Sequence, residues 1–346
     1  MASTGYYQCS TVLDESNVPP NNTLAEIVAG LAHAHKAYIE QHPKTSPYIL
    51  FVIQPNERNV FDQRFLEYEL LQTHGIRAVR RTFEELETQS YLAEDSRALL
   101  LKTSTSTTPV EISLVYFRAG YAPTDYPTPT HYETRRTLER SAAIKCPSLA
   151  LQLAGSKKVQ AVLSRSGVVE EFILGDYWAT ISQDNAHSFT GKDVDTLRAS
   201  WMEMYCLEED GAVSKAREAA QGLVLKPQRE GGGNNVYKGN IPAFLDKLQE
   251  SEREAWIAMA LIKVPKDVGN VLVRSGSEPV RASVVSELGI FGWALFGFQS
   301  DSSTDGERLK LEEGSGGYLL RTKGEDSDEG GVATGFSVLD SVILVD

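Results

Sequence analysis

Cysteine is scarce in this 346-residue chain, which contains only Cys9, Cys146 and Cys206, far apart and without a Cys-x-x-Cys spacing. Cysteines placed in this way indicate neither a disulfide framework nor a zinc site. The chain also lacks any run of about 18 uncharged apolar residues. Its first ten residues have no positive charge and no apolar core of a secretory signal. We therefore expect a cytoplasmic protein with no membrane-spanning segment.

Positive charge is also in deficit, since 34 Lys and Arg residues face 47 Asp and Glu residues and the net charge is −13. Nucleic acids and anionic membranes attract proteins that present a net basic face. The composition therefore predicts no nucleic-acid partner and no membrane partner. Hydrophobic residues make up 41% of the chain, enough for a buried core. Because ordinary domains hold about 100–200 residues, we expect two or three modules.

The first half of the chain alternates helical and strand-like patterns. A Thr-x-x-Glu capping box at Thr23, followed by apolar residues at helical spacing, predicts a helix to about Tyr38. Unbroken apolar runs at 48–53 and 111–117 predict buried strands, and a helix over 62–73 and a strand over 76–79 follow the first run. This order of strand, helix and strand favours a parallel sheet, whose ligands lie at the carboxyl ends of its strands.

Three further segments carry weaker patterns. Alternating Thr and Ser over 102–109 predict a loop. Charged and apolar residues alternate at helical spacing over 132–144, which predicts a helix. The segment 175–196 has few apolar residues and is typical of a long connection between modules.

Candidate ligand-binding residues lie after two of the predicted strands. They are Glu57, Arg58, Asn59 and Gln63 after the first strand, and Arg118, Ala119, Gly120 and Tyr121 after the strand at 111–117. An arginine offers a bidentate fork to a carboxylate, so the second group suits a carboxylate-bearing ligand. From the residues alone, the alternatives are an exposed polar connection for the first group and a surface salt bridge for the second.

The sharpest local pattern is the segment 223–237, in which an apolar strand leads to Lys226 and then to a loop with three consecutive glycines. Consecutive glycines let backbone N–H groups approach a phosphate chain closely. Lys226 supplies a positive charge, and Glu230 is a hard oxygen ligand for magnesium. The loop matches neither a Walker motif nor a dinucleotide fingerprint. It predicts phosphate binding, with a flexible glycine-rich hairpin as the alternative.

A second glycine-rich stretch, 330–335, follows a strand that ends with Arg321 and Lys323. Two such loops, each with a cation at the end of a strand, suit an enzyme that closes over a nucleotide and a carboxylate substrate. The acidic run between Lys323 and this stretch is typical of a solvated loop.

Seven motifs, taken in order, resemble the eukaryotic-type glutathione synthetase family from about residue 22 to 340. They are NERNVFDQR (56–64), VYFRAGY (115–121), LERSAAIKCP (138–147), LAGSKKVQ (153–160), the loop 226–235 with Tyr237, SELGIFG (286–292), and 320–323 with 330–333. The resemblance implies an α/β ATP-grasp fold with a three-layer parallel-sheet substrate-binding domain and a glycine-rich lid. It further implies an amino-terminal helical remnant (1–45), a substrate-binding α/β domain (46–160) and an ATP-grasp domain (161–346) whose lid loops are 226–235 and 330–335.

The same resemblance implies an ATP-dependent carbon–nitrogen ligase that joins γ-glutamylcysteine to glycine, giving glutathione through an acyl phosphate. ATP and Mg²⁺ would be its cofactors, and the assembly would be a homodimer. Such a reaction depends on positioning and charge stabilisation, and it needs no protein nucleophile.

The resemblance also implies roles for individual residues. Lys157, Lys226 and Arg321 would be catalytic, and Glu230 would bind magnesium. The nucleotide would contact Lys157, Lys226, Pro227, Gln228, Arg229, Glu230, Gly231, Gly232, Gly233, Asn234, Asn235, Tyr237, Glu287, Lys323 and Glu329. The dipeptide, glycine or product would contact Glu57, Arg58, Asn59, Gln63, Arg118, Ala119, Gly120, Tyr121, Arg321, Val332 and Ala333.

Departures from the family pattern support a second hypothesis. The chain begins after the family's amino-terminal segment that supplies a magnesium-binding Glu and Asn. It has Ala260 in place of a glutamate that contacts ATP, and Glu329 in place of an aspartate. The alternative is a truncated, non-catalytic homologue that binds nucleotide or glutathione or pairs with a full-length subunit.

Overall fold

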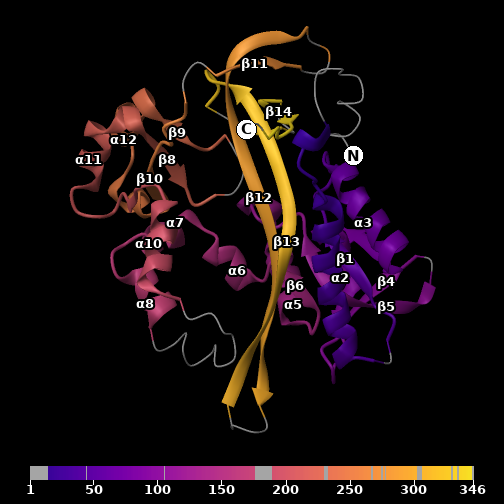
Figure 1. The fold of residues 1–346 in the computed structure, drawn as a ribbon. Helices are drawn as coiled ribbons and strands as arrows, with labels where there is room; N and C mark the ends of the chain where they lie inside the picture. The colour runs from indigo at the N-terminus through magenta and orange to yellow at the C-terminus, as the bar shows by residue number, and fades with distance from the viewer. Residues whose placement is uncertain are drawn as a thin grey trace.

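Three β-sheets organise the chain in a computed structural model (Figure 1). The structure describes residues 15–43, 45–104, 106–175, 189–229, 233–265, 268–273, 276, 278–301, 306–328, 330–332 and 335–344. One six-stranded sheet contains the amino-terminal strands, and two four-stranded sheets follow along the chain. Within the described ranges, no helix combines the length and the apolar character that a membrane span requires.

The amino-terminal sheet is mixed. Its strands are β1 (Tyr48–Val52), β2 (Ala78–Arg81), β3 (Ser90–Leu92), β4 (Leu99–Thr103), β5 (Ser106–Phe117) and β6 (Ile144–Cys146). The strand order is β2-β1-β5-β4-β3, and β6 also pairs with β5. Strands β1, β2, β5 and β6 are parallel, as predicted, whereas β3 and β4 add two antiparallel strands at one side.

Helices cover both faces of this sheet. The 3-10 turn η1 (Glu15–Asn17) precedes α2 (Thr23–Gln41); the others are α3 (Val60–His74), α4 (Phe83–Gln89), the 3-10 turn η2 (Pro123–Asp125) and α5 (Pro129–Arg140). Helices α2 and α3 pack on Ile49 and Phe51, while α4 and α5 pack on Leu50 and Val52. All four strand residues are fully buried, because successive side chains of a strand point to opposite faces. The predicted three-layer arrangement is confirmed.

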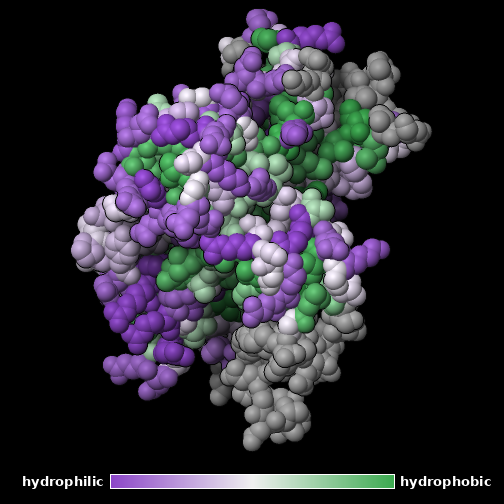
Figure 2. Space-filling model, turned by 90° about the vertical axis from the view of Figure 1, so that its left-hand side faces the viewer, coloured by the Kyte–Doolittle hydropathy of each residue, from purple (hydrophilic) through white to green (hydrophobic). Residues whose placement is uncertain are grey.

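The second sheet is antiparallel and carries most of the remaining helices. Its order is β7 (Met204–Cys206), β10 (Trp256–Ala260), β8 (Leu223–Pro227) and β9 (Val236–Tyr237). The helices around it are α6 (Leu149–Ala154), α7 (Lys157–Leu163), α8 (Val168–Leu174), α10 (Gly191–Ala199), α11 (Ala212–Glu218), α12 (Ile241–Leu245), and the 3-10 turns η3 (Ala220–Gly222), η4 (Lys238–Asn240) and η5 (Glu250–Ala255). Figure 2 views the molecule from this side, where polar side chains cover most of the face and apolar ones form separate patches.

The third sheet is built on a long hairpin. Its strands are β11 (Gly269–Leu272), β12 (Val280–Asp301), β13 (Gly306–Gly324) and β14 (Ser337–Asp340), all antiparallel. The β12–β13 hairpin crosses the molecule in Figure 1 and packs against α2. Helix α2 therefore contacts β5 of the first sheet and the hairpin of the third sheet.

Close contact between α2 and the hairpin depends on a glycine. The ring of His33 lies 5.0 Å from that of Trp293, measured between centroids. A Cβ atom built on Gly30 would lie 2.6 Å from Cγ of Trp293. At the start of the helix, the Asn21 amide donates to the carbonyl of Tyr318 at 2.8 Å. Side-chain volume at residue 30 would therefore separate the helix from the hairpin.

Several local predictions were wrong. The Thr23 capping box does not form, because Thr23 lies inside the helix and the carboxylate of Glu26 accepts a hydrogen bond from Ser315 of the hairpin at 2.7 Å. A capping box forms instead at Thr82 with Glu85. The segment 102–109 is not a loop: β4 continues to Thr103 and β5 starts at Ser106. The reason is that β-branched threonines suit paired strands.

Other boundaries moved by a few residues. The helix predicted over 132–144 ends at Arg140, and β6 takes the end of that segment. The connection predicted over 175–196 already contains the start of α10 at Gly191, and residues 176–188 lie outside the described residues. By contrast, α3 ends at His74, one residue beyond its predicted end, and is capped by Gly75 in the left-handed conformation, φ 67°.

We expect Gly30→Ala to lower the free energy of unfolding by about 1–3 kcal/mol, because the added methyl group must displace the Trp293 ring. Gly191→Ala is the matched control, since a Cβ atom there has no described neighbour within 4 Å. Urea unfolding of both variants measures the difference. Equal stabilities would show that the close approach at Trp293 is not a packing constraint.

Candidate functional site

The two predicted groups of polar residues meet at one edge of the first sheet. In the parallel pair, Val52 of β1 lies opposite Phe117 of β5, and the N–H of Arg118 donates to the carbonyl of Val52 at 2.7 Å. The side chain of Gln54, after β1, donates to the hydroxyl of Tyr121, after β5, at 3.1 Å. The structure thus brings the predicted residues after β1 beside those after β5.

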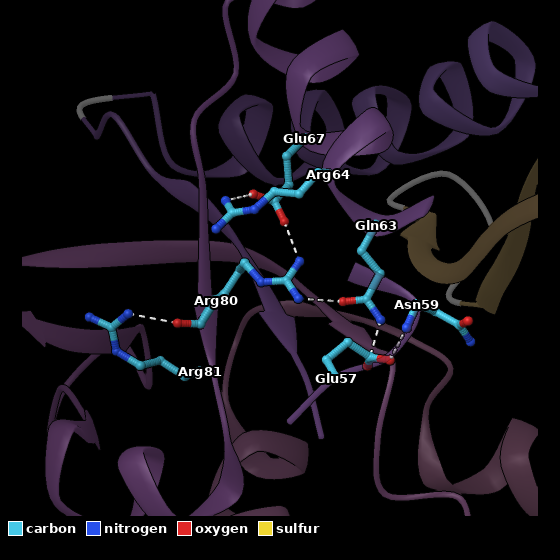
Figure 3. A network of polar contacts seen from close by, with 7 residues as sticks. All are labelled: Glu57, Asn59, Gln63, Arg64, Glu67, Arg80 and Arg81. Atoms are coloured by element: carbon cyan, nitrogen blue, oxygen red, sulfur yellow. Dashed lines mark hydrogen bonds and ion pairs between the residues drawn. The ribbon is translucent and has the colours of Figure 1, made fainter. Parts of the chain in front are cut away.

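The carboxylate of Glu57 accepts two hydrogen bonds in the turn that follows β1. Its Oε1 accepts the backbone N–H of Asn59 at 2.9 Å, and its Oε2 accepts the side-chain amide of Gln63 at 2.7 Å (Figure 3). Gln63 is only 1% exposed, so its amide contacts Glu57 and not the solvent. Arg58, by contrast, is exposed between them.

The loop after β5 is held by a carboxylate that the sequence analysis missed. Oδ2 of Asp125 accepts the backbone N–H groups of Gly120, Tyr121 and Ala122 at 2.8, 3.2 and 3.2 Å. Three convergent N–H groups on one carboxylate make a rigid turn. Its signal in the sequence is an Asp a few residues after a glycine, a spacing too common to be decisive.

Gly120 is required by the shape of this loop. Its φ is +88°, and a Cβ atom there would lie 2.8 Å from the Tyr126 hydroxyl. That hydroxyl donates to the Gly120 carbonyl at 2.9 Å, and so does the amide of Gln152 in α6. Ala119 before it is buried. Glycine is therefore the residue that fits both the backbone conformation and the close contact.

Charges of both signs surround the Tyr121 phenol. Partial burial and the carboxylate of Asp125 raise its pKa, Arg118 lowers it, and Glu57 raises it further. The phenol therefore lies within electrostatic range of the predicted cation and of the predicted carboxylate. The Nε atom of Arg118 is buried without a described hydrogen-bond partner. This edge can thus offer a guanidinium and a carboxylate to one ligand.

A second group lies where α7 meets β8. Lys157 begins α7, and its Nζ donates to Gln160 at 3.1 Å. Lys226 is half-buried in β8 and pairs in register with Ile257 of β10. The side chain of Gln228 accepts the backbone N–H of Lys158 at 2.9 Å, which ties the end of β8 to the first turn of α7.

Only part of the glycine-rich loop after β8 is described. Pro227 is buried, Arg229 and Asn234 are exposed, and Gly233 has φ +85°. Asn235 donates to the hydroxyl of Tyr237 at 3.0 Å. Glu230, Gly231 and Gly232 lie outside the described residues. Within the described part of the chain, no group of three or more His, Cys, Asp and Glu side chains could hold a metal ion.

The third group lies on the β12–β13 hairpin. Arg321 and Glu287 stand opposite each other in the register and form an ion pair. Lys323 donates to the carbonyl of Asp328 at 3.1 Å, and the carboxylate of Asp328 pairs with Lys238 at 2.9 Å. Because Lys238 follows Tyr237 directly, this pair joins β9 to the connection after β13.

The second glycine-rich stretch is described only in part. The Gly330 carbonyl accepts the Ser337 hydroxyl at 2.9 Å, so this stretch runs beside β14. Val332 is half-buried, and Glu329 and Ala333 lie outside the described residues. The predicted residues therefore form three groups: the edge of the first sheet, the α7–β8 junction, and the hairpin. Gln152 connects the first group to the second, because α6 leads directly into α7.

Comparison with known proteins covers nearly the whole chain. A family model described as the eukaryotic glutathione synthase, ATP binding domain, matches residues 1–344. The chain is 34% identical over 339 residues to the glutathione synthetase large chain of Schizosaccharomyces pombe, covering 94% of this chain and 62% of that protein. It is 38% identical over 333 residues to the glutathione synthetase of Bos taurus, covering 95% of this chain and 62% of that protein. The chain thus spans less than two thirds of the length of these curated relatives.

A solved structure supports the same fold. The apo form of a glutathione synthetase-like effector from Globodera pallida aligns with a TM-score of 0.63 at 19% identity. The alignment covers 94% of this chain and 62% of that chain. This likeness agrees with the ATP-grasp fold that the sequence motifs predict.

We expect Asp125→Ala to loosen the loop after β5 without unfolding the sheet. The backbone amides of Gly120, Tyr121 and Ala122 should exchange with solvent deuterons at least about tenfold faster, because a hydrogen bond to a charged acceptor contributes about 1.5–3 kcal/mol. Asp95→Ala, in the exposed turn between β3 and β4, is the control. Unchanged exchange at the three amides would contradict the anchoring role of Asp125.

Proposed function

Because this chain belongs to the eukaryotic glutathione synthase family, we propose that it is an ATP-dependent ligase that joins γ-glutamylcysteine to glycine to form glutathione. The observation that carries the proposal beyond family membership is the parallel register of β1 and β5. The turn that contains Glu57 follows β1 and the loop that contains Arg118 follows β5, and both charges act on the pKa of Tyr121. A carboxylate and a guanidinium at the same edge would suit a zwitterionic amino-acid group, which supports the proposal.

The proposed reaction has two steps. ATP transfers its γ-phosphoryl group to the cysteinyl carboxylate of the dipeptide and leaves as ADP. The amine of glycine then attacks the carbonyl carbon of this acyl phosphate, the C–N bond forms, the C–O bond to phosphate breaks, and the amine loses a proton. Both steps gain rate from fixed charges and alignment of the reactants.

The described cations are distributed in a way that suits these steps. Lys157 and Lys226, near the α7–β8 junction, would neutralise the nucleotide phosphates. Arg321 on the hairpin would stabilise the charge that develops on the transferred group. Arg118 would pair with a substrate carboxylate, and Glu57 with the ammonium group of the γ-glutamyl end. A chain with net charge −13 needs such local cations to attract anionic substrates.

Magnesium would accompany ATP in this reaction, and the described residues bear on how the chain would hold it. They supply no cluster of metal-binding side chains, and the proposed ligand Glu230 lies outside them. We also propose a homodimer, which the family resemblance implies, and a cytoplasmic location, which the sequence analysis expects; the relatives from Solanum lycopersicum and Arabidopsis thaliana are described as chloroplastic.

A second candidate function is a non-catalytic relative that binds nucleotide or glutathione or pairs with a full-length subunit. The feature that favours it is Ala260 at the end of β10, opposite Leu223 of β8. An alanine there offers no carboxylate beside the strand that carries Lys226.

Release of ADP by the purified chain decides between the two candidates. With ATP and magnesium present, we expect release only when both γ-glutamylcysteine and glycine are added, together with stoichiometric glutathione. Nucleotide binding without any substrate-dependent release would favour the non-catalytic relative.

Two substitutions should affect the KM values for γ-glutamylcysteine and for ATP differently. Arg118→Lys removes the bidentate fork and should raise the KM for γ-glutamylcysteine by about 10- to 100-fold, with the KM for ATP nearly unchanged. Lys226→Met should raise the KM for ATP and leave the KM for γ-glutamylcysteine nearly unchanged. Arg136→Met, an exposed residue of α5 that pairs with Glu133, is the control. Steady-state kinetics measure both constants, and parallel changes in both KM values would contradict the assignment.

A further inference from the structure

A buried ion pair lies behind Glu57, on the side of α3 and β2. Nη1 of Arg80 lies 2.7 Å from Oε1 of Glu67, and both side chains are at most 10% exposed. The other terminal nitrogen, Nη2, donates to Oε1 of Gln63 at 2.7 Å. Figure 3 shows these side chains as one continuous line of contacts that ends at Glu57.

Arg80 decides which way the Gln63 amide points. A guanidinium can only donate hydrogen bonds, so the oxygen of the carboxamide must face Arg80. The amide nitrogen then faces the carboxylate of Glu57, at 2.7 Å from Oε2. Without the cation, the amide would lose the contact that anchors its oxygen, and the Gln63 side chain would be held at Glu57 alone. The orientation of the Glu57 carboxylate therefore depends on Arg80, although Arg80 reaches Glu57 only through the amide of Gln63.

Glu67 makes this arrangement possible by neutralising Arg80. A buried cation without a partner is strongly destabilising. Glu67 also accepts a hydrogen bond from Arg64 through its second oxygen, at 2.7 Å. The Arg64 side chain is 44% exposed, so this second contact lies toward the solvent. Arg80 is thus the member of the network that reaches toward the site, and Arg64 the member that reaches away from it.

Stability alone is a weak reason for such a pair. Replacing a buried ion pair by apolar side chains of similar size is often neutral or stabilising. The arrangement instead has the properties of a positioning device: short contacts, little exposure, and a fixed direction from donor to acceptor. Each oxygen of Glu57 accepts one N–H group, from Asn59 or Gln63, and keeps a lone pair for a ligand.

We propose that Arg80, neutralised by Glu67, is a positioning residue for the dipeptide site. It fixes the amide of Gln63 and, through that amide, aims the carboxylate of Glu57 at the ammonium group of the γ-glutamyl end. This inference rests on the proposed function, because the dipeptide is the ligand that Glu57 would hold.

The double variant Glu67→Met, Arg80→Met tests the proposal without leaving a single buried charge. We expect the KM for γ-glutamylcysteine to rise by about 10- to 100-fold, as for loss of a hydrogen bond to a charged group, while the KM for ATP changes less than about twofold. Arg64→Met is the matched control, since it also removes a partner of Glu67 but leaves the Arg80–Gln63 contact in place. A thermal unfolding midpoint near that of the wild type shows that the double variant folds.

A coupling measurement separates positioning from a purely structural role. In a Gln63→Met background, the same double substitution should raise the dipeptide KM no further, because the amide through which Arg80 acts is already gone. An equal increase in both backgrounds overturns the proposal. So does a double variant that folds and keeps the wild-type dipeptide KM.

Calorimetry with γ-glutamylcysteine tests the role of Arg80 separately from the ligase proposal. A wild-type chain that binds the dipeptide without turning it over contradicts the ligase proposal, yet the dissociation constants of the same variants still test the role of Arg80. Weaker binding by the Glu67→Met, Arg80→Met variant, with unchanged binding by Arg64→Met, supports it. A wild-type chain with neither binding nor turnover overturns both.

Discussion

The backbone N–H of Arg118 donates to the carbonyl of Val52, and this bond marks the end of the parallel pairing between β1 and β5. The candidate dipeptide site depends on that pairing. The two segments that carry its polar residues lie some sixty positions apart in the chain, and they meet because both follow strands that run in the same direction. A shift of register by one residue would turn the buried side chains of β1 to the opposite faces of the sheet.

Rigidity at this edge comes from short polar contacts rather than from apolar packing alone. Asp125 collects three backbone N–H groups of the loop after β5. Glu57 holds the turn after β1, and Gln63 joins Glu57 to the buried pair of Arg80 and Glu67. Such contacts are costly to break where water is scarce, so they can hold reacting groups in place. The same physics suits a reaction that needs alignment and charge rather than a protein nucleophile.

Much of the fold could be predicted from the sequence because its signals are local. Residues 49–52 of β1 are buried on both faces of the sheet, as their unbroken apolar run predicts. Helix α3 ends at His74, one residue beyond its predicted end, and Gly75 caps it. Two local predictions failed for different reasons. Glu26 matches a capping box, but its carboxylate binds Ser315, nearly three hundred residues away. Alternating Thr and Ser over 102–109 predict a loop, yet Thr103 of β4 pairs with Ser106 of β5.

The sequence by itself determined the family, the layered α/β arrangement, and the residues that stand at strand ends, because motifs, periodicity and chain order are all properties of neighbouring residues. Only the tertiary structure decided which of those residues touch and what holds them. Arg80 carries no motif, and nothing near it in the chain marks it as part of a site. Its role follows from the pairing of β2 with β1 and the packing of α3 beside them, which bring its guanidinium to Gln63 across seventeen residues of chain. Contacts of this kind depend on long-range packing, and local patterns do not encode them.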